Sequence, residues 1–343
     1  MGKTVQTVKG SLAPELLGKT LTHEHLLWDQ LCWWKGDPEE LSKREFVHQK
    51  VCLENLGQIY YNAHQNLDNI QQYDLKLAIK EAAEYKMAGG STIVEVSSNG
   101  LGRDPNALLA VSEMTGLNIV MGSGYYISNS HPAELKEKSA VEIACLIINE
   151  FENGVKDTGI KPGIIGEIGI SDINNCEEIK VLTAAAMAQK ETGAPLSIHP
   201  PIFETRGNDL LDVVEKAGGD LTRTVMCHCD CTLNEPDYHD SMARRGAFIE
   251  FDTFGCEFLA LEGFFLPRDI DRIKAILMQL DKGNKEKLLL SHDIAFKTCL
   301  KSYGGWGYGH LLRDIVPFMK KAGMGKNELD AFFIDNPKRL LAY

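Results

Sequence analysis

The sequence predicts an α/β fold of the (β/α)8 TIM-barrel class. Eight short apolar or β-branched runs alternate with helix-like stretches along the 343 residues. The runs are apolar throughout rather than alternating, which is typical of parallel strands buried on both faces. No Gly-x-Gly-x-x-Gly motif follows an early strand. A closed barrel is therefore favoured over an open doubly wound sheet, which stays the alternative.

The predicted strands are rich in valine, isoleucine and leucine, and most are bounded by glycine, proline or polar residues. In chain order they cover 19–27, 92–97, 118–122, 163–169, 195–199, 223–228, 247–252 and 287–293. A strand followed by a helix eight times over is the repeat that closes into a barrel.

The clearest predicted helix covers 68–88. Ile70, Leu77 and Tyr85 fall near one face, and 89–90 is a glycine pair that would end the helix. No linker, low-complexity segment or short repeat divides the chain, so we expect a single barrel domain over 1–343. The other predicted helices cover 104–115, 132–153, 177–191, 208–217, 235–245, 268–281 and 309–322.

Composition narrows the class of partner. The formal net charge is -12 and 44% of the residues are hydrophobic. Nucleic acid and anionic membranes need a basic face, so we expect neither, and a small-molecule substrate instead. No run resembles a signal peptide or approaches the roughly 18 apolar residues of a membrane helix. We therefore expect a cytoplasmic protein with reduced cysteines; a homodimer is compatible with the sequence, which leaves the oligomeric state open.

The motif His23-Glu24-His25 lies inside the first predicted strand, 19–27. Side chains two positions apart on a strand point to the same side, so both imidazoles would converge while Glu24 faces the other way. Two neutral imidazoles are good ligands for zinc or a related metal. Taken alone, such a pair is more often a surface or core accident, so its interpretation depends on the rest of the chain.

Other histidines and carboxylates stand at the carboxyl ends of predicted strands, where barrel enzymes carry their active sites. A hydrogen-bonded core histidine is the usual explanation for any one of them, but six independent accidents are improbable. Four imidazoles and two carboxylates suit two divalent ions that share a bridging carboxylate and a bridging hydroxide. The candidate metal ligands are His23, His25, Glu167, His199, His228 and Asp293.

The motifs around these residues resemble the amidohydrolase superfamily and, within it, the phosphotriesterase-like family. Segment 18–26 is similar to that family's first signature, and 198–200, 227–228 and 291–293 match its later metal-bearing positions. The resemblance extends over essentially the whole chain, from about residue 10 to 336–340.

One position departs from the family pattern. The family often has a carboxylated lysine on the fourth strand, where this chain has Glu167. Together with 122–126, this departure resembles the subgroup of phosphotriesterase-related proteins, in which an N-acetyltaurine hydrolase activity is known. A native carboxylate can bridge two metals without carbon dioxide, so the departure alters assembly more than charge.

The resemblance implies roles for the six residues. His23, His25 and Asp293 would hold a buried metal, His199 and His228 an outer one, and Glu167 would bridge the two ions, with zinc the expected metal. A hydroxide between two such ions is a nucleophile at neutral pH. Asp293 would act as the catalytic group that passes its proton to the leaving group.

The implied function is a dinuclear-metal-dependent hydrolase, an amidase acting on small N-acyl amines such as N-acetyltaurine. A lactonase and a promiscuous phosphotriesterase are the alternatives among enzymes, because the same chemistry would attack those centres. From another class, the chain would be a metal-binding regulatory protein with a relic site.

Two further motifs have competing interpretations. Cys227, Cys229 and Cys231 flank His228, and we expect Cys227 and Cys229 to point outward to the helices as inert thiols. Asp252 ends the seventh strand and would either orient a ligand, contact substrate or cap a loop.

The loops supply candidates for the pocket. Packing between loops is the rival role for each aromatic residue. Cationic residues on loops would meet an anionic substrate head, although such residues are more often solvated. The aromatic candidates are Trp33, Trp34, Tyr125, Tyr126, Trp306 and Tyr308, and the cationic ones are His131, Arg206 and Lys297.

Overall fold

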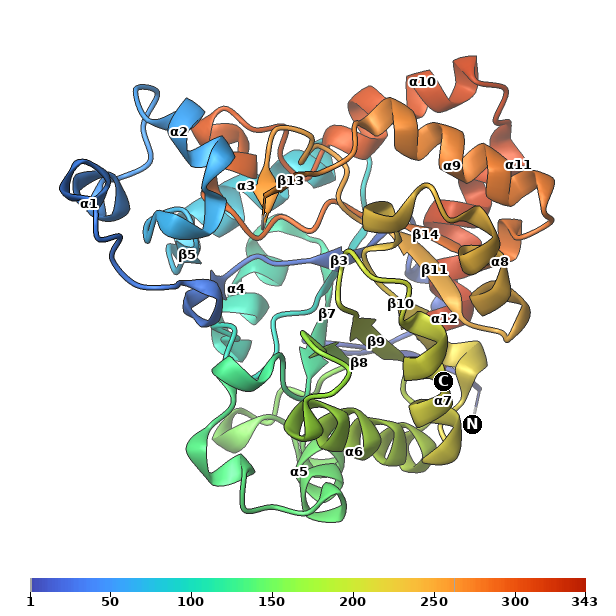
Figure 1. The fold of residues 1–343 in the computed structure, drawn as a ribbon. Coiled ribbons are helices and arrows are strands. Elements are labelled where there is room, and N and C mark those ends of the chain that lie inside the picture. The colour runs from blue at the N-terminus through green and yellow to red at the C-terminus, as the bar shows by residue number, and fades with distance from the viewer. Residues whose placement is uncertain (1, 262) are drawn as a thin grey trace.

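A computed structural model describes residues 2–261 and 263–343, and its central feature is an eight-stranded parallel sheet. Neighbouring strands pair in sequence order. The two outermost strands also meet, because the Asp293 amide donates to the His23 carbonyl at 3.3 Å. The predicted barrel is confirmed (Figure 1). Its strands are β3 (Thr20–Glu24), β6 (Thr92–Glu95), β7 (Asn118–Ser123), β8 (Ile164–Gly169), β9 (Leu196–His199), β10 (Thr224–Met226), β11 (Phe248–Phe251) and β14 (Leu288–Leu290).

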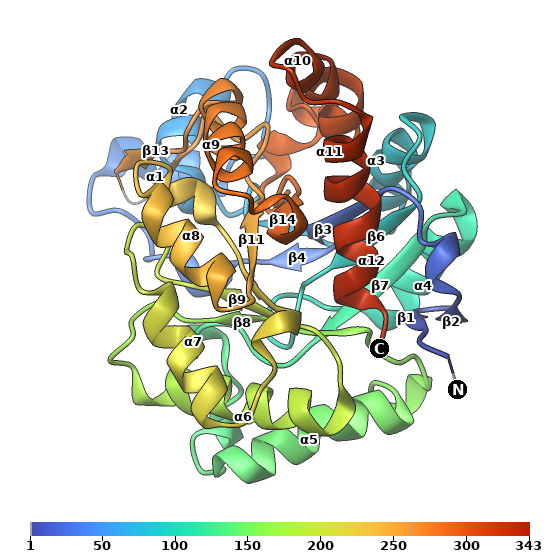
Figure 2. The same ribbon diagram turned by 90° about the vertical axis from the view of Figure 1, so that its right-hand side faces the viewer.

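Helices surround the sheet and cover its outer face (Figures 1 and 2). Seven of them connect consecutive barrel strands or precede them: α3 (Leu75–Met87), α4 (Pro105–Thr115), α5 (Ala140–Asn153), α6 (Cys176–Thr192), α7 (Gly207–Lys216), α8 (Pro236–Arg244) and α9 (Asp269–Asp281). Three more follow β14: α10 (Val316–Lys321), α11 (Lys326–Asp330) and α12 (Asn336–Leu341).

Smaller elements decorate the two ends of the barrel. The hairpin of β1 (Val5–Thr7) and β2 (Gly10–Leu12) lies near both termini. The opposite end carries α1 (Leu41–His48), α2 (Leu56–Tyr61), the pair β4 (Trp28–Asp29) and β5 (Gln71–Gln72), and the hairpin β12 (Ala260–Leu261) and β13 (Phe264–Phe265). Both ribbon views place α1, α2 and β13 away from the termini.

The apolar core has two layers. Inside the barrel, Val94, Val120, Val225, Phe248 and Leu289 pack together and are fully or almost fully buried. A larger cluster fills the space between the outer face of the sheet and the helices. Burial on both faces explains why the strand sequences are apolar throughout.

The predicted helix at 68–88 begins too early. Helix α3 starts at Leu75, with Asp74 as its N-cap: the Asp74 carboxylate accepts from the amides of Lys76 and Leu77. An aspartate before an apolar periodic run is an N-terminal signal that the periodicity masked. The residues before it form β5 and a loop held by Asp68, whose carboxylate accepts from the Val51 amide.

The helix predicted at 132–153 is also shorter than expected. Ser139 and Glu142 form a reciprocal capping box, so α5 begins at 140. The segment 309–322 is divided between a π-helical turn at 311–315 and α10. Across 2–261 and 263–343, no helix has the length and apolar character that crossing a membrane requires.

Candidate metal centre

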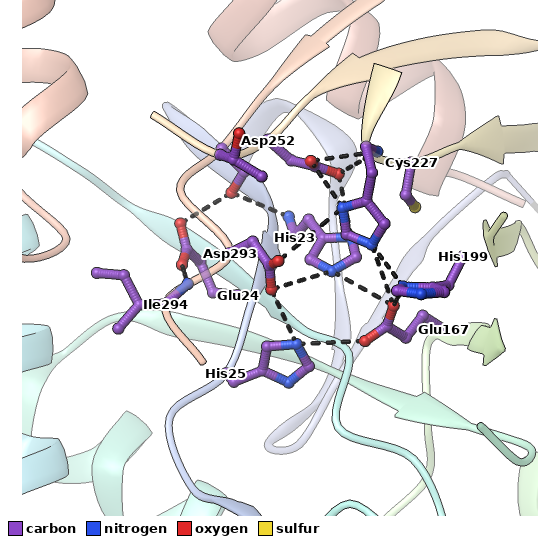
Figure 3. Close-up of polar contacts among 12 residues, drawn as sticks. His23, Glu24, His25, Glu167, His199, Cys227, Asp252, Asp293 and Ile294 are labelled. Atoms are coloured by element: carbon purple, nitrogen blue, oxygen red, sulfur yellow. Dashed lines mark hydrogen bonds and ion pairs between the residues drawn. The ribbon is translucent and has the colours of Figure 1, made fainter. Parts of the chain in front are cut away.

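The predicted convergence of His23 and His25 is present at the carboxyl end of β3. Both side chains are buried, and their ring centroids lie 5.7 Å apart. Figure 3 shows both imidazoles pointing toward Asp293 and Glu167, with Glu24 turned the other way. Strand alternation alone therefore placed this pair correctly.

Glu167 enters the cluster from β8, where the pairing with β9 is irregular between Ile165 and Ile168. The preceding residue, Gly166, has a φ of 123°. A Cβ atom there would lie 2.4 Å from the Ser197 carbonyl oxygen, so this position requires glycine. The irregularity turns the Glu167 carboxylate into the barrel mouth, where it is almost fully buried.

The remaining three residues stand at or just beyond other strand ends. His199 is the last residue of β9, whereas His228 and Asp293 follow β10 and β14. His228 and Asp293 have positive φ values of 54° and 50°. Left-handed backbone at residues other than glycine is uncommon and is concentrated at functional sites.

All six predicted residues lie in one cluster (Figure 3). His25 Nε2 is 3.3 Å from Glu167 Oε1 and 3.2 Å from Asp293 Oδ1. His199 Nδ1 and His228 Nε2 approach Glu167 Oε2 to 3.1 and 3.5 Å. Ligand atoms about 2.1 Å from one ion are separated by roughly such distances. Glu167 contacts both groups of imidazoles, with its longest distance, to His23 Nε2, at 3.7 Å.

The cluster fits divalent ions by two independent signs. His23 Nε2 is buried without a hydrogen-bond partner, 3.7 Å from Glu167 Oε2 and 3.6 Å from Asp293 Oδ1. Although burial lowers the pKa of His25, the Asp293 and Glu167 carboxylates raise it to about 10 overall. An orphaned nitrogen and an excess of negative charge are what bound cations would correct.

Glu24 positions the segment that carries Asp293. Its Oε1 accepts from the Ser291 hydroxyl at 2.8 Å and from His292 Nδ1 at 2.7 Å, and its Oε2 accepts from the Ile294 amide at 3.1 Å. Glu24, on β3, therefore fixes the segment that follows β14, the strand that meets β3 where the barrel closes.

A buried serine orients His25. His25 Nδ1 lies 2.9 Å from Ser97 Oγ, and Ser97 reaches Glu95 Oε1 at 2.6 Å and the Leu27 carbonyl at 2.9 Å. Because the single hydroxyl proton goes to one of these acceptors, Ser97 Oγ accepts from Nδ1–H. The Nε2 lone pair is then left for a metal.

Asp252 performs the same task for His228. Its carboxylate accepts from the His228 amide and lies 2.9 Å from Nδ1, which leaves Nε2 facing Glu167. Its own amide donates to Asp230, which is paired with the fully buried Arg272 at 2.6 Å. Of the three roles considered for Asp252, orienting a neighbouring ligand is the one that the structure supports.

The expected orientation of Cys227 is wrong. Cys227 packs inside the barrel, with its Sγ 3.0 Å from Ser197 Oγ, rather than outward against the helices. Strand β10 ends at Met226 and the backbone of His228 is left-handed, so alternation does not continue through 227–229. Cys229 does lie in the outer core as expected, and burial raises the pKa of both thiols.

A cavity of about 240 Å³ opens over the cluster and is bordered by His199, His228 and Asp293. Of the six aromatic candidates, Trp33 and Tyr126 line it. Tyr125 packs against His131, Trp306 stacks on His310, and the Tyr308 hydroxyl donates to the His25 carbonyl. Trp34 packs against the outer core.

The three cationic candidates do not line this cavity. Lys297 Nζ binds the Asp68 carboxylate at 2.8 Å, and Arg206 pairs at the surface with Asp209. His131 Nε2 donates to the Tyr126 carbonyl at 2.8 Å, and burial lowers its pKa. Each already has a partner that its sequence position did not reveal.

Sequence reasoning missed several polar residues that line the cavity, among them Gln30 and His64. Both lie in the long segment between β3 and α3, where no strand or helix period marks a side chain as inward-facing. His64 is on a short turn, and burial lowers its pKa to about 4. Its imidazole is therefore neutral.

Comparison with known proteins agrees with this geometry. A phosphotriesterase-related protein from Nematostella vectensis is 39% identical, over 98% of each chain. The N-acetyltaurine hydrolase of Homo sapiens is 37% identical, over 99% of this chain and 98% of its own. A resiniferatoxin-binding protein from Rhodobacter sphaeroides has a TM-score of 0.95 at 37% identity and covers 98% of this chain and 94% of its own.

A lactonase from Listeria monocytogenes is more distant, with a TM-score of 0.80, 25% identity and 98% coverage of both chains. The profile of the Phosphotriesterase family matches residues 3–341. The buried cluster and this match together indicate divalent-metal binding. The prediction of a metal-dependent hydrolase is confirmed, and the chain belongs to the phosphotriesterase family.

Proposed function

We propose that this protein is an amidase that hydrolyses small N-acyl amines, with two divalent ions, zinc by preference, held by the six clustered residues. The supporting observation is the position of Glu167 between the His23–His25 pair and the His199–His228 pair, with Asp293 on the other side. When bound, such ions lower the pKa of water and polarise a carbonyl oxygen.

The protein's own groups have separate tasks in this proposal. Glu167 lies between both groups of imidazoles. Glu24 fixes the segment of Asp293, and Asp252 fixes the ring of His228. Asp293 is 21% exposed at its side chain and borders the cavity, so it can pass a proton to a leaving amine. The cavity above, of about 240 Å³, suits a small substrate.

N-acetyltaurine is the substrate that the names of the relatives suggest for this protein. A cation for its sulfonate lies in a neighbouring recess of about 150 Å³, which shares Trp33 and His64 with the catalytic cavity and is lined by Lys35. Burial and, after it, the Lys35 charge lower the pKa of His64, and both side chains line this recess. Lys297, Arg206 and His131 line neither the cavity nor this recess, so Lys35 takes their place in this proposal.

The experiment is a comparison of kcat/KM for N-acetyltaurine, a simple lactone and a neutral phosphotriester on one metal-loaded preparation. The amide should be the best substrate, and elemental analysis should find about two metal equivalents. A lactone or phosphotriester turned over a hundredfold better would replace the amidase by the alternative activity.

Lys35→Met should raise KM for N-acetyltaurine about tenfold and leave an uncharged N-acetyl alkylamine unchanged. Lys50→Met, at an exposed lysine of the same segment, is the matched control. An equal loss on both substrates would mean that Lys35 supports the loop rather than the sulfonate.

A further inference from the structure

Gln30 occupies a fixed position at the edge of the catalytic cavity. It lies between β4 and the short turn Leu31–Trp33. Its amide donates to the Ile70 carbonyl at 3.0 Å, and its carbonyl accepts from the Trp33 amide at 3.0 Å. Both backbone groups are therefore satisfied, and the side chain projects from an anchored base.

The side chain itself is not satisfied. Gln30 is 8% exposed, and its Oε1 is buried without a hydrogen-bond partner. A buried acceptor left unpaired costs about 1–3 kcal/mol, so native structures rarely keep one without a reason. Gln30 lines the same cavity as His199 and Asp293, so a ligand in the cavity whose donor reaches Oε1 can supply the missing hydrogen bond.

Other polar side chains of the cavity wall already have protein partners. The Tyr126 hydroxyl accepts from Trp33 Nε1 and contacts His199, and Ser171 Oγ donates to Glu178. Thr253 Oγ1 accepts from Arg272. Gln30 thus offers the wall's unpaired buried acceptor among the described residues.

We propose that Gln30 is a specificity-determining residue whose Oε1 accepts the N–H of the scissile amide. This inference rests on the proposed amidase function and names the group that would select an amide. Secondary amides carry a donor beside the carbonyl, whereas lactones, esters and phosphotriesters present an oxygen there. An ester would place two acceptors face to face and leave Gln30 unpaired.

The hydrogen bond also suits the course of the reaction. Water adds its oxygen to the carbonyl carbon, and the nitrogen of the tetrahedral species keeps one hydrogen and gains a basic lone pair. With the N–H held by Gln30, that lone pair is left to take the water-derived proton passed on by Asp293. The C–N bond then breaks, giving a carboxylic acid and an amine.

The first test measures binding alone. A phosphonamidate and the matching phosphonate ester mimic the tetrahedral species and differ by one N–H for one oxygen. The metal-loaded wild type should bind the phosphonamidate about ten- to a hundredfold more tightly. Gln30→Met, similar in size but without the amide, should bring the two dissociation constants to within about threefold of each other. Equal binding in the wild type, or no binding of either compound, would reject the assignment.

The second test compares turnover of one N-acyl amine and its O-acyl ester. Gln30→Met should lower kcat/KM for the amide by about ten- to a hundredfold and leave the ester nearly unchanged. Gln58→Met, on the exposed face of α2, should change neither.

The outcomes separate the two proposals. An equal loss on amide and ester in Gln30→Met would show a structural role for Gln30 and leave the amidase standing. A wild type that hydrolyses the ester but never the amide would reject the amidase, and the two analogues would still decide what Gln30 recognises.

Discussion

The two halves of the ligand cluster differ in how the surrounding protein holds them. In the inner half (His23, His25 and Asp293), Ser97 orients His25, and Glu24 binds the segment of Asp293 by several hydrogen bonds. In the outer half (His199 and His228), Asp252 orients His228, but outside the cluster the ring of His199 meets the Tyr126 hydroxyl and the Trp33 ring. His199 is also more exposed, at 8%, than the fully buried His23.

This difference teaches that His199 is held by fewer hydrogen bonds than the oriented ligands His25 and His228. Preoriented ligands bind a metal more tightly because less reorganisation is needed. Both residues of the outer half border the cavity where a substrate would enter, whereas Asp293 alone of the inner half does so. We therefore expect the outer ion to be the weaker one and the more responsive to small changes in the wall.

The largest expected effect comes from removing the residue that joins the halves. Glu167→Ala should lose metal from both halves, and activity should fall by more than the roughly 10²–10⁴-fold of a single acid–base group. Metal content and kcat measured on one preparation check this, with Glu191→Ala, at an exposed glutamate, as the control. Wild-type activity should be independent of bicarbonate. A bicarbonate requirement would point to a carboxylated lysine as the bridge.

Asp293→Asn should separate chemistry from assembly in the inner half. The amide oxygen can still bind a metal but cannot accept a proton, so kcat should fall about 10²–10⁴-fold while the fold and most of the metal remain. Circular dichroism and elemental analysis provide the necessary checks. Near-normal turnover would assign the proton transfer to another group.

A matched pair of variants should sharpen the contrast between the halves. Asp252→Asn weakens the partner of His228, and Ser97→Ala removes the partner of His25. Each should lower the affinity of one ion by about 10–100-fold. In chelator titrations, Asp252→Asn should lose the outer ion first and keep one equivalent, whereas Ser97→Ala should bring the two losses closer together. Identical titrations for both variants would contradict the division into halves.

The inner half is also the half that the sequence predicted best. His23 and His25 follow from strand alternation, because a regular strand fixes the direction of every second side chain. Asp293 and His228 were placed correctly at strand ends, but their left-handed backbone was not predictable from residue type. The same irregularity turned Cys227 inward, against expectation.

The wall of the cavity depends on tertiary contacts that no local sequence pattern predicts. Gln30 and His64 line the cavity from a long segment that has no clear hydrophobic periodicity. Lys297 does not line the cavity, because its ammonium group binds the Asp68 carboxylate instead. The early start predicted for α3 failed for a related reason: apolar spacing was given more weight than the N-cap Asp74. The periodicity of apolar residues predicts the barrel, whereas hydrogen bonds and ion pairs between side chains determine which residues line the cavity.

The smallest expected effect lies at the contact that distinguishes the halves. Tyr126 Oη is 3.2 Å from His199 Nδ1, and Tyr126→Phe removes this contact while keeping the ring in the cavity wall. One neutral hydrogen bond contributes about 0.5–1.5 kcal/mol, so the outer ion should bind roughly two- to tenfold more weakly, with little change in the inner ion. Tyr125→Phe is the matched control, because the ring of Tyr125 packs on His131 instead. The same effect in Tyr125→Phe, or loss of the inner ion first in Tyr126→Phe, would contradict this explanation. The weaker binding of the outer ion would then have to come from the greater exposure of His199 rather than from its few hydrogen bonds.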